Sequence, residues 1–204
     1  TVVTQVLVDN RDPAFSNPTK PIGSFYTEEE AQKHQAESGW TLKEDAGRGW
    51  RRVVASPKPL RIVEEDTVRL LLEQDVVVIA VGGGGIPVRE NEQGELEGCA
   101  AVIDKDLASC LLAKNLKADL FIISTGVDKV AVDFKKPTQR ELDKLTVAEA
   151  KKYLAEGQFP AGSMGPKIEA AIDFLEHGGK EVIITQPFLL EEAIAGRNGT
   201  HLVP

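Results

Sequence analysis

Two lysines stand where helices are expected to begin, and they are the clearest chemical signal in the chain. Lys105 lies in segment 101–109 (AVIDKDLAS) and Lys167 in segment 162–169 (GSMGPKIE). A helix N-terminus already carries partial positive charge and unpaired N–H groups, so a lysine there is unfavourable unless an anion is bound. Both are therefore candidate catalytic or phosphate-binding residues. The alternative for each is an ordinary surface lysine.

A run of four glycines that begins at Gly82 directly follows the apolar residues 76–81. Backbone without side chains can approach a ligand closely and offer N–H groups to an anion. The spacing does not match a dinucleotide-binding loop, because proline replaces its last glycine, and no Gly-Lys-Ser/Thr follows as in a P-loop. We predict that Gly82, Gly83 and Gly84 bind a ligand, with a tight strand-to-loop turn as the alternative.

Two further polar side chains could assist the lysines. Asp106 follows Lys105 directly, and its carboxylate could hold a lysine or a metal-bound water; a solvated charge pair behind the helix cap Asp104 is the alternative. Lys20 lies between two prolines, whose rigidity lowers the entropy cost of fixing its side chain. From local sequence alone, an exposed lysine in a turn is the favoured interpretation of Lys20.

A second group of candidates lies in the C-terminal half. Thr125, Gly126 and Val127 follow the apolar run 120–124, at the carboxyl end of an expected strand, where open α/β sheets bind ligands. A plain β-turn explains them equally well. Met164 precedes Lys167 closely and could lie against a nucleotide base, with a core methionine as the alternative.

Buried strands alternating with helices must position these groups. Continuous apolar runs are typical of parallel strands that are covered on both faces. The pattern predicts an α/β fold, a three-layer αβα sandwich with a mostly parallel sheet, plus a small inserted lobe at about residues 10–52. The expected strands are 2–8, 76–81, 120–124, 181–185 and 200–203, with a hairpin over 89–98. The expected helices are 27–38, 62–73, 104–116, one from 146, one from Pro166 to about 177, and 189–195.

Composition restricts the class of protein. The 204 residues suffice for one full domain, and a net charge of −8 argues against a nucleic-acid partner. Two cysteines and three scattered histidines favour neither a disulfide framework nor a zinc site, so a cytoplasmic setting is expected. No apolar run reaches membrane-spanning length, so no membrane partner is expected.

Taken in order, the segments resemble the carbamate kinases of the amino-acid kinase family. The resemblance extends from Thr4 to Thr200. It rests on NPTKPIG (17–23), EDAGRGWR (44–51), SPKP (56–59), GGGGIP (82–87), AVIDKDLAS (101–109) and GSMGPK (162–167).

This resemblance implies reversible phosphoryl transfer in which ATP and carbamate give ADP and carbamoyl phosphate. Mg²⁺ would accompany the nucleotide without a dedicated set of protein ligands, the protein would be a homodimer, and the reaction would serve arginine breakdown. Lys105 and Lys167 would contact the transferred phosphoryl and nucleotide phosphates, Asp106 would orient them, and Lys20 would close over the carbamate. The implied nucleotide contacts are Gly82, Gly83, Gly84, Thr125, Gly126, Val127, Met164 and Lys167.

Two family motifs, an N-terminal Gly-Gly-Asn-Ala loop and a His-Gly-Asn-Gly-Pro-Gln segment, are not in this sequence. The chain begins without Met inside a strand-like run, and we expect it to correspond to the C-terminal two-thirds of such an enzyme. Activity of the 204 residues alone is therefore uncertain. The open alternatives are a sister kinase for an acyl-amino acid or a nucleoside monophosphate, and a non-catalytic nucleotide-binding or dimerisation fragment. The glycine spacing disfavours a Rossmann dehydrogenase.

Overall fold

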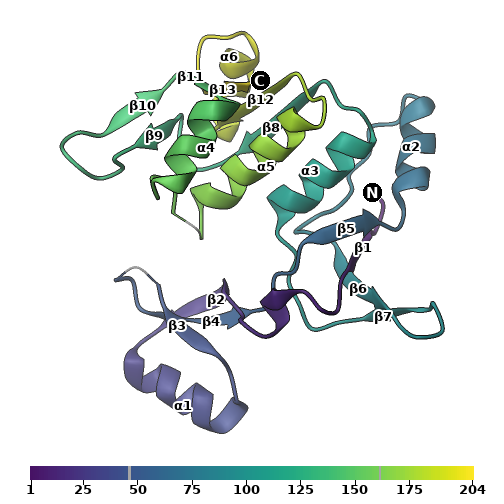
Figure 1. Cartoon of the computed structure of the whole chain (residues 1–204), viewed down its shortest axis with the longest axis vertical. Helices are drawn as coiled ribbons and strands as arrows, with labels where there is room; N and C mark the ends of the chain where they lie inside the picture. Colours follow the sequence, from purple (N-terminus) through teal and green to yellow (C-terminus); the bar gives the residue numbers. More distant parts are fainter. Residues whose placement is uncertain (46, 161) are drawn as a thin grey trace. The chain divides into compact units, whose positions relative to one another are not determined.

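The computed structural model describes residues 1–45, 47–160 and 162–204. Ala46, inside the EDAGRGWR motif, and Ala161 lie outside the described residues. The chain divides into two compact units, Thr1–Ala108 and Ser109–Pro204. Both units combine strands with helices (Figure 1), which confirms the predicted α/β class.

The first unit contains a four-stranded sheet with the order β5-β1-β6-β7. Strand β1 pairs parallel with β6 and antiparallel with β5, and β7 pairs antiparallel with β6, so the sheet is mixed. The hairpin predicted over 89–98 is confirmed by β6 and β7. The elements are β1 (Gln5–Val8), β5 (Pro59–Ile62), α2 (Glu65–Glu73), β6 (Ile86–Glu90) and β7 (Leu96–Gly98). The buried side chains of this sheet and helix include Val6, Val8, Ile62, Val68 and Val88.

The stretch predicted as a lobe has a sheet of its own, in which β4 pairs antiparallel with both β2 and β3. Thr27 caps the helix beside it: its hydroxyl accepts the N–H of Glu30, whose carboxylate accepts the N–H of Thr27. His34 and Trp40 stack with ring centroids 4.6 Å apart. The elements are the 3₁₀ turn η1 (Pro13–Phe15), β2 (Lys20–Tyr26), α1 (Glu28–Ser38), β3 (Leu42–Glu44) and β4 (Trp50–Val54).

The second unit contains a mixed sheet with the order β11-β13-β12-β8. Strands β8 and β12 are parallel, β13 is antiparallel to β12, and β11 is parallel to β13. Three strands match the predicted ranges 120–124, 181–185 and 200–203: β8 (Leu120–Ser124), β12 (Glu181–Thr185) and β13 (Thr200–Val203). The remaining strands are β11 (Lys144–Thr146) and an unpredicted hairpin of β9 (Val130–Val132) and β10 (Arg140–Leu142).

Helices α4 and α5 pack against each other, and α5 also contacts β8 and β12 (Figure 1). Phe174 of α5 is fully buried, and its ring lies 5.5 Å from that of Phe121 on β8. Thr146 and Glu149 form a capping box at the start of α4, which confirms the helix predicted from residue 146. The helices are α3 (Lys105–Asn115), which crosses the boundary of the units, α4 (Val147–Ala155), α5 (Met164–Glu176), the 3₁₀ turn η2 (Pro187–Leu189) and α6 (Leu190–Ile194).

Several predicted elements or boundaries are wrong, and the strand expected over 2–8 begins only at Gln5. Residues 76–81 form no strand. Among the described residues, the run accepts one backbone hydrogen bond from a neighbouring segment, from the N–H of Val2 to the carbonyl oxygen of Ile79 at 2.8 Å, and this is too few for a strand. The helix expected from residue 62 begins at Glu65, since the preceding residues pair with β1. Pro166 is the third residue of α5 rather than the first, a position where its absent N–H still costs no helical bond.

Candidate functional site

Lys20 is held against the start of α3, although it lies 84 residues away in the sequence. Its Nζ donates to Oδ2 of Asp104 over 2.7 Å, and both side chains are mostly buried. Burial by itself would raise the pKa of the Asp104 carboxyl, but the hydrogen bond and charge of Lys20, with two backbone N–H donors, outweigh it and lower that pKa. Local sequence favoured an ordinary surface lysine, and the tertiary contact corrects that interpretation.

The predicted cap of α3 is confirmed. Asp104 Oδ1 accepts the N–H of Asp106 at 2.9 Å and the more distant N–H of Leu107 at 3.4 Å. Lys105 is the first residue of the helix, and its Nζ lies 3.0 Å from Oδ2 of Asp106. The Asp106 residue is buried whereas the Lys105 side chain is half exposed, so the carboxylate anchors an ammonium group that solvent can reach.

The chain turns sharply as it enters the glycine run. Val81 has φ 64°, a rare conformation for a β-branched residue that is retained only where the surroundings enforce it. Its N–H donates to the buried hydroxyl of Thr4 over 2.7 Å, and this contact fixes the strained residue. The bond therefore fixes the point at which the chain enters the glycine run.

The glycines differ in what the fold requires of them. A Cβ on Gly84, where φ is +134°, would lie 2.3 Å from the carbonyl oxygen of Ile103, so this glycine permits close packing against the residue before Asp104. A Cβ on Gly83 would meet no atom within 4 Å, and its φ is not in the positive range. A tight turn therefore explains Gly84 but not Gly83, whose open surface remains available to a ligand.

In the second unit, the predicted nucleotide residues line one cavity of about 310 Å³. This volume lies at the lower end of the range for small-molecule sites. The cavity brings together Thr125, Gly126, Val127, Met164 and Lys167. Its other lining residues are Lys129, Ala131, Phe134, Gln139, Glu141, Gln158, Phe159, Pro160 and Ser163.

The end of β8, the start of α5 and the β9–β10 hairpin position these groups. The N–H of Thr125 donates to the Thr185 carbonyl at 2.8 Å, which ties the end of β8 to the end of β12. Lys167 is buried in the first turn of α5, where the helix N-terminus adds positive potential. The β9–β10 region adds Phe134 and Glu141, which sequence reasoning missed because strands of three residues give little periodicity. An apolar wall with a buried cation suits a planar ring that carries an anionic group.

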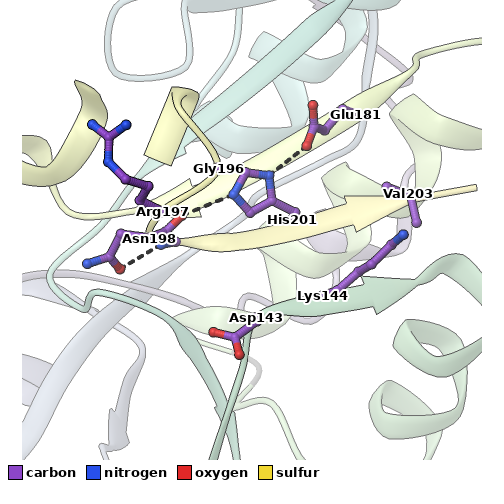
Figure 2. A pocket seen from close by; sticks show the side chains of 9 residues that line it. Asp143, Lys144, Glu181, Gly196, Arg197, Asn198, His201 and Val203 are labelled. Carbon is purple, nitrogen blue, oxygen red and sulfur yellow. Dashed lines mark hydrogen bonds and ion pairs between the residues drawn. The ribbon is translucent and has the colours of Figure 1, made fainter. Parts of the chain in front are cut away.

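A larger cavity, of about 530 Å³, lies elsewhere in the second unit and contains no predicted site residue (Figure 2). His201 projects into it, with Nδ1 2.6 Å from the Glu181 carboxylate and Nε2 3.0 Å from the Asn198 carbonyl oxygen (Figure 2). Arg197, on its rim, pairs with Glu192 at 2.5 Å. The predicted nucleotide residues line the smaller cavity and not this one, so the smaller cavity is the better candidate ligand site.

Cys110 is buried, and burial with the neighbouring Asp173 carboxylate raises the pKa of its thiol to about 12, as expected for an unreactive cysteine. Within the described parts of the chain, no three His, Cys, Asp or Glu side chains are grouped to hold a metal ion. A search of the same residues finds no helix with the length and apolar character needed to cross a membrane.

Known proteins match the chain along its whole length. The carbamate kinase-like protein YahI of Escherichia coli is 52% identical over 204 residues, which are 100% of this chain and 65% of that protein. The carbamate kinase of Thermococcus kodakarensis is 53% identical over 203 residues, 100% of this chain and 64% of that protein. The structure of Giardia lamblia carbamate kinase bound to AMP-PNP superposes with a TM-score of 0.84 and 47% identity, covering 99% of this chain and 64% of the other.

These similarities confirm the resemblance to carbamate kinases that the motifs indicated. The chain spans slightly less than two-thirds of the length of the curated relatives it matches. The sequence profile of the amino acid kinase family matches residues 23–186, which include the glycine run and both helix-start lysines. This chain therefore belongs to the amino acid kinase family.

Proposed function

We propose that the chain acts in carbamate kinase catalysis, the reversible transfer of a phosphoryl group between ATP and carbamate. The observation that carries the proposal is the cavity of the second unit, lined by all five residues predicted there for nucleotide binding. Its support is the similarity over the whole chain to carbamate kinases, one of which has been solved with an ATP analogue.

In this proposal the second unit binds the nucleotide. Val127 and Met164 supply apolar contacts for the base, with Thr125 and Gly126 beside them. Lys167 neutralises phosphate charge at the N-terminus of α5, where the helix dipole also favours an anion. The burial of Lys167 limits its motion, which favours a positioning and electrostatic role over transient contact.

The first unit supplies charges for the transferred group and the carbamate. Phosphoryl transfer depends mainly on positioned cations, because charge spreads over the phosphoryl oxygens in the transition state. Lys105, anchored by Asp106, contacts the phosphoryl group, and Lys20, aligned by Asp104, contacts the carbamate or carbamoyl phosphate. Gly82, Gly83 and Gly84 line the phosphate path.

Mg²⁺ enters the proposal with the nucleotide. The described side chains form no metal-binding cluster, and Asp104 and Asp106 are both engaged by lysines, so phosphate oxygens and water would hold the ion. When bound, Mg²⁺ supplies charge neutralisation. The proposal also covers the whole protein. It would have a three-layer αβα sandwich with a mostly parallel sheet and would form a homodimer. It would be cytoplasmic and would serve arginine breakdown.

The test combines nucleotide binding with turnover. ADP binding to the 204-residue chain is measured by calorimetry, and ATP formation is measured with ADP, Mg²⁺ and carbamoyl phosphate. Binding with ATP formation supports the proposal. Absence of ADP binding would refute the assignment of the cavity. Gly126→Trp is the matched blocking variant, because a Cβ at this position meets no atom within 4 Å and the large ring would then occupy the cavity.

A second candidate is nucleotide binding without catalysis. It is favoured by the length of the chain, which spans 64–65% of its relatives, and one of those relatives is named only as carbamate kinase-like. ADP binding without ATP formation would support this candidate. Competition by an acyl-amino acid or a nucleoside monophosphate, with no effect of carbamoyl phosphate, would instead indicate a sister kinase.

A further inference from the structure

The hairpin of β9 and β10 supplies part of the wall of the candidate nucleotide cavity, yet it is not part of the main sheet of the second unit. The region contributes five of the residues that line the cavity: Lys129, Ala131, Phe134, Gln139 and Glu141. Its two strands form a sheet of their own, separate from the four-stranded sheet (Figure 1). A two-stranded hairpin by itself is only marginally stable in water. Contacts with the rest of the unit must therefore set its position.

The two faces of the hairpin have different surroundings. Along β9, Val130 and Val132 are buried, whereas Ala131 between them lines the cavity, as expected from the alternation of side chains in a strand. On β10, Leu142 is buried and pairs with Val130. Glu141 pairs with Ala131 and lines the cavity beside it. A contact that fixes the buried pair therefore also fixes the residues that face a ligand.

Thr200 makes this contact. It is fully buried in the first position of β13, a strand of the main sheet. Its Oγ1 accepts the N–H of Val130 over 2.8 Å and donates to the carbonyl oxygen of Leu142 over 2.5 Å. One hydroxyl thus satisfies a main-chain donor of β9 and a main-chain acceptor of β10, and it ties both strands to β13. Thr200 itself is not among the residues that line the cavity.

We infer that Thr200 is a positioning residue for nucleotide binding. The inference rests on the proposed function, because the cavity is the proposed nucleotide site. Removal of the hydroxyl leaves a buried N–H and a buried carbonyl without this partner, which favours displacement of the hairpin. Displacement moves Ala131 and Glu141 relative to Met164 and Lys167, which line the same cavity from α5. The fit of the cavity to its ligand then changes although every lining residue is kept.

Paired substitutions at Thr200 test the role of the hydroxyl. Thr200→Val keeps the shape of the side chain and removes the hydroxyl, whereas Thr200→Ser keeps the hydroxyl and removes the methyl group. Calorimetry should show a Kd for ADP that is at least about tenfold higher in Thr200→Val, as for the loss of one buried hydrogen bond, and within about threefold of the unaltered value in Thr200→Ser. Val182→Ala is the control, because Val182 is buried in β12 and pairs with Leu202 and Phe121 in the main sheet. It lowers stability and should leave the Kd for ADP unchanged. Circular dichroism establishes that each variant is folded at the temperature of the measurement.

Hydrogen exchange in the unaltered chain gives a second test, which does not depend on the folding of a variant. If the bond between Val130 and Thr200 favours nucleotide binding, bound nucleotide must favour that bond by the same factor. Saturating ADP should therefore slow exchange of the Val130 amide by about tenfold beyond any slowing at Ile183. Ile183 is the reference because it lies in the centre of β12 and reports the stabilisation of the whole unit by ADP.

The outcomes separate this inference from the proposed function. Absence of ADP binding by the unaltered chain would refute the proposed nucleotide site, and the inference with it. Equal affinities of the unaltered chain and Thr200→Val would leave the site in place and overturn the positioning role. Equal losses in Thr200→Val, Thr200→Ser and Val182→Ala would also overturn it, because reduced stability would then explain the result. If Thr200→Val does not fold, the exchange measurement decides: slowing at Val130 no greater than at Ile183 would overturn the inference.

Discussion

Two apolar runs of similar composition differ in structure: one forms a buried strand, and the other is largely exposed and forms no strand. Strand β12 (EVIIT) lies between β8 and β13, and its Val182, Ile183 and Ile184 are at most 1% exposed. Residues 76–81 (VVVIAV) are at least as apolar, yet they form no ladder, and Val77 is almost fully exposed. The difference shows that an apolar run becomes a strand only when neighbours on its edges accept its hydrogen bonds.

The same contrast extends to the candidate site. In the second unit, a closed core supports a cavity that already contains the residues predicted for a nucleotide. In the first unit, Lys20 and Lys105 pair with carboxylates at the start of α3. The second unit is therefore preorganised by packing, whereas the first is organised by ion pairs and tight turns. The following predictions test this contrast in order of decreasing effect.

The largest expected effect is on turnover. Lys167→Ala should lower kcat/KM for ATP formation by about 10²–10³-fold, equivalent to about 3–4 kcal/mol of transition-state stabilisation. Lys105→Ala should act similarly, whereas Lys20→Ala should mainly impair use of carbamoyl phosphate. Steady-state kinetics with both substrates varied provide the measurement. The exposed Lys151, paired with Glu176 on the protein surface, is the control. Unchanged kcat/KM in Lys167→Ala would remove its assigned role.

A matched pair of valines compares the two runs directly. Val182→Ala should lower the free energy of unfolding by about 2 kcal/mol or more, because it removes buried methyl groups and leaves a cavity. Val77→Ala should change the stability of the same chain by no more than about 0.5 kcal/mol. Urea denaturation followed by circular dichroism measures both. Equal losses in the two variants would mean that residues 76–81 are packed after all.

Substitutions at Gly83 and Gly84 distinguish a glycine that the backbone packing requires from one that is open to a ligand. Gly84→Ala should destabilise the chain by about 1–3 kcal/mol, because a Cβ at φ +134° would overlap the Ile103 carbonyl oxygen. Gly83→Ala should leave stability within about 0.5 kcal/mol but reduce phosphate-dependent binding. Thermal unfolding and binding of ADP with inorganic phosphate are the two readouts. A large stability loss in Gly83→Ala would contradict its assignment as a ligand-facing position.

The smallest effect concerns acid stability. The lowered pKa of Asp104 means that its stabilising charge is fully present above the unfolded value of 3.8 and is lost as the pH falls through the folded pKa. Asp104→Asn should cost about 1 kcal/mol at neutral pH and flatten the loss of stability below pH 3.8. Unfolding measured from about pH 6 to about pH 2.5 gives both slopes. If the free energy of unfolding depended on pH in the same way in both proteins, the pKa of Asp104 would not be lowered by folding.

Much of the local structure could be predicted from sequence. The capping boxes at Thr27 and Thr146 are formed by side chains three residues apart, so adjacent sequence contains all their determinants. Strands β8, β12 and β13 were found from short apolar runs. Five residues that line the cavity of about 310 Å³ could be chosen as candidates because their motifs follow a strand end or precede a helix.

Other features depended on contacts between distant segments. The Lys20–Asp104 pair joins residues 84 positions apart, the β9–β10 region supplies an unforeseen wall of the cavity, and residues 76–81 lack the neighbours a strand requires. The sequence by itself determined the helix caps and the types of side chain proposed for the site, because these follow from hydrogen bonds and residue types within a few positions. Only the tertiary structure decided which strands are paired and which cations are anchored, because both depend on what packs beside them.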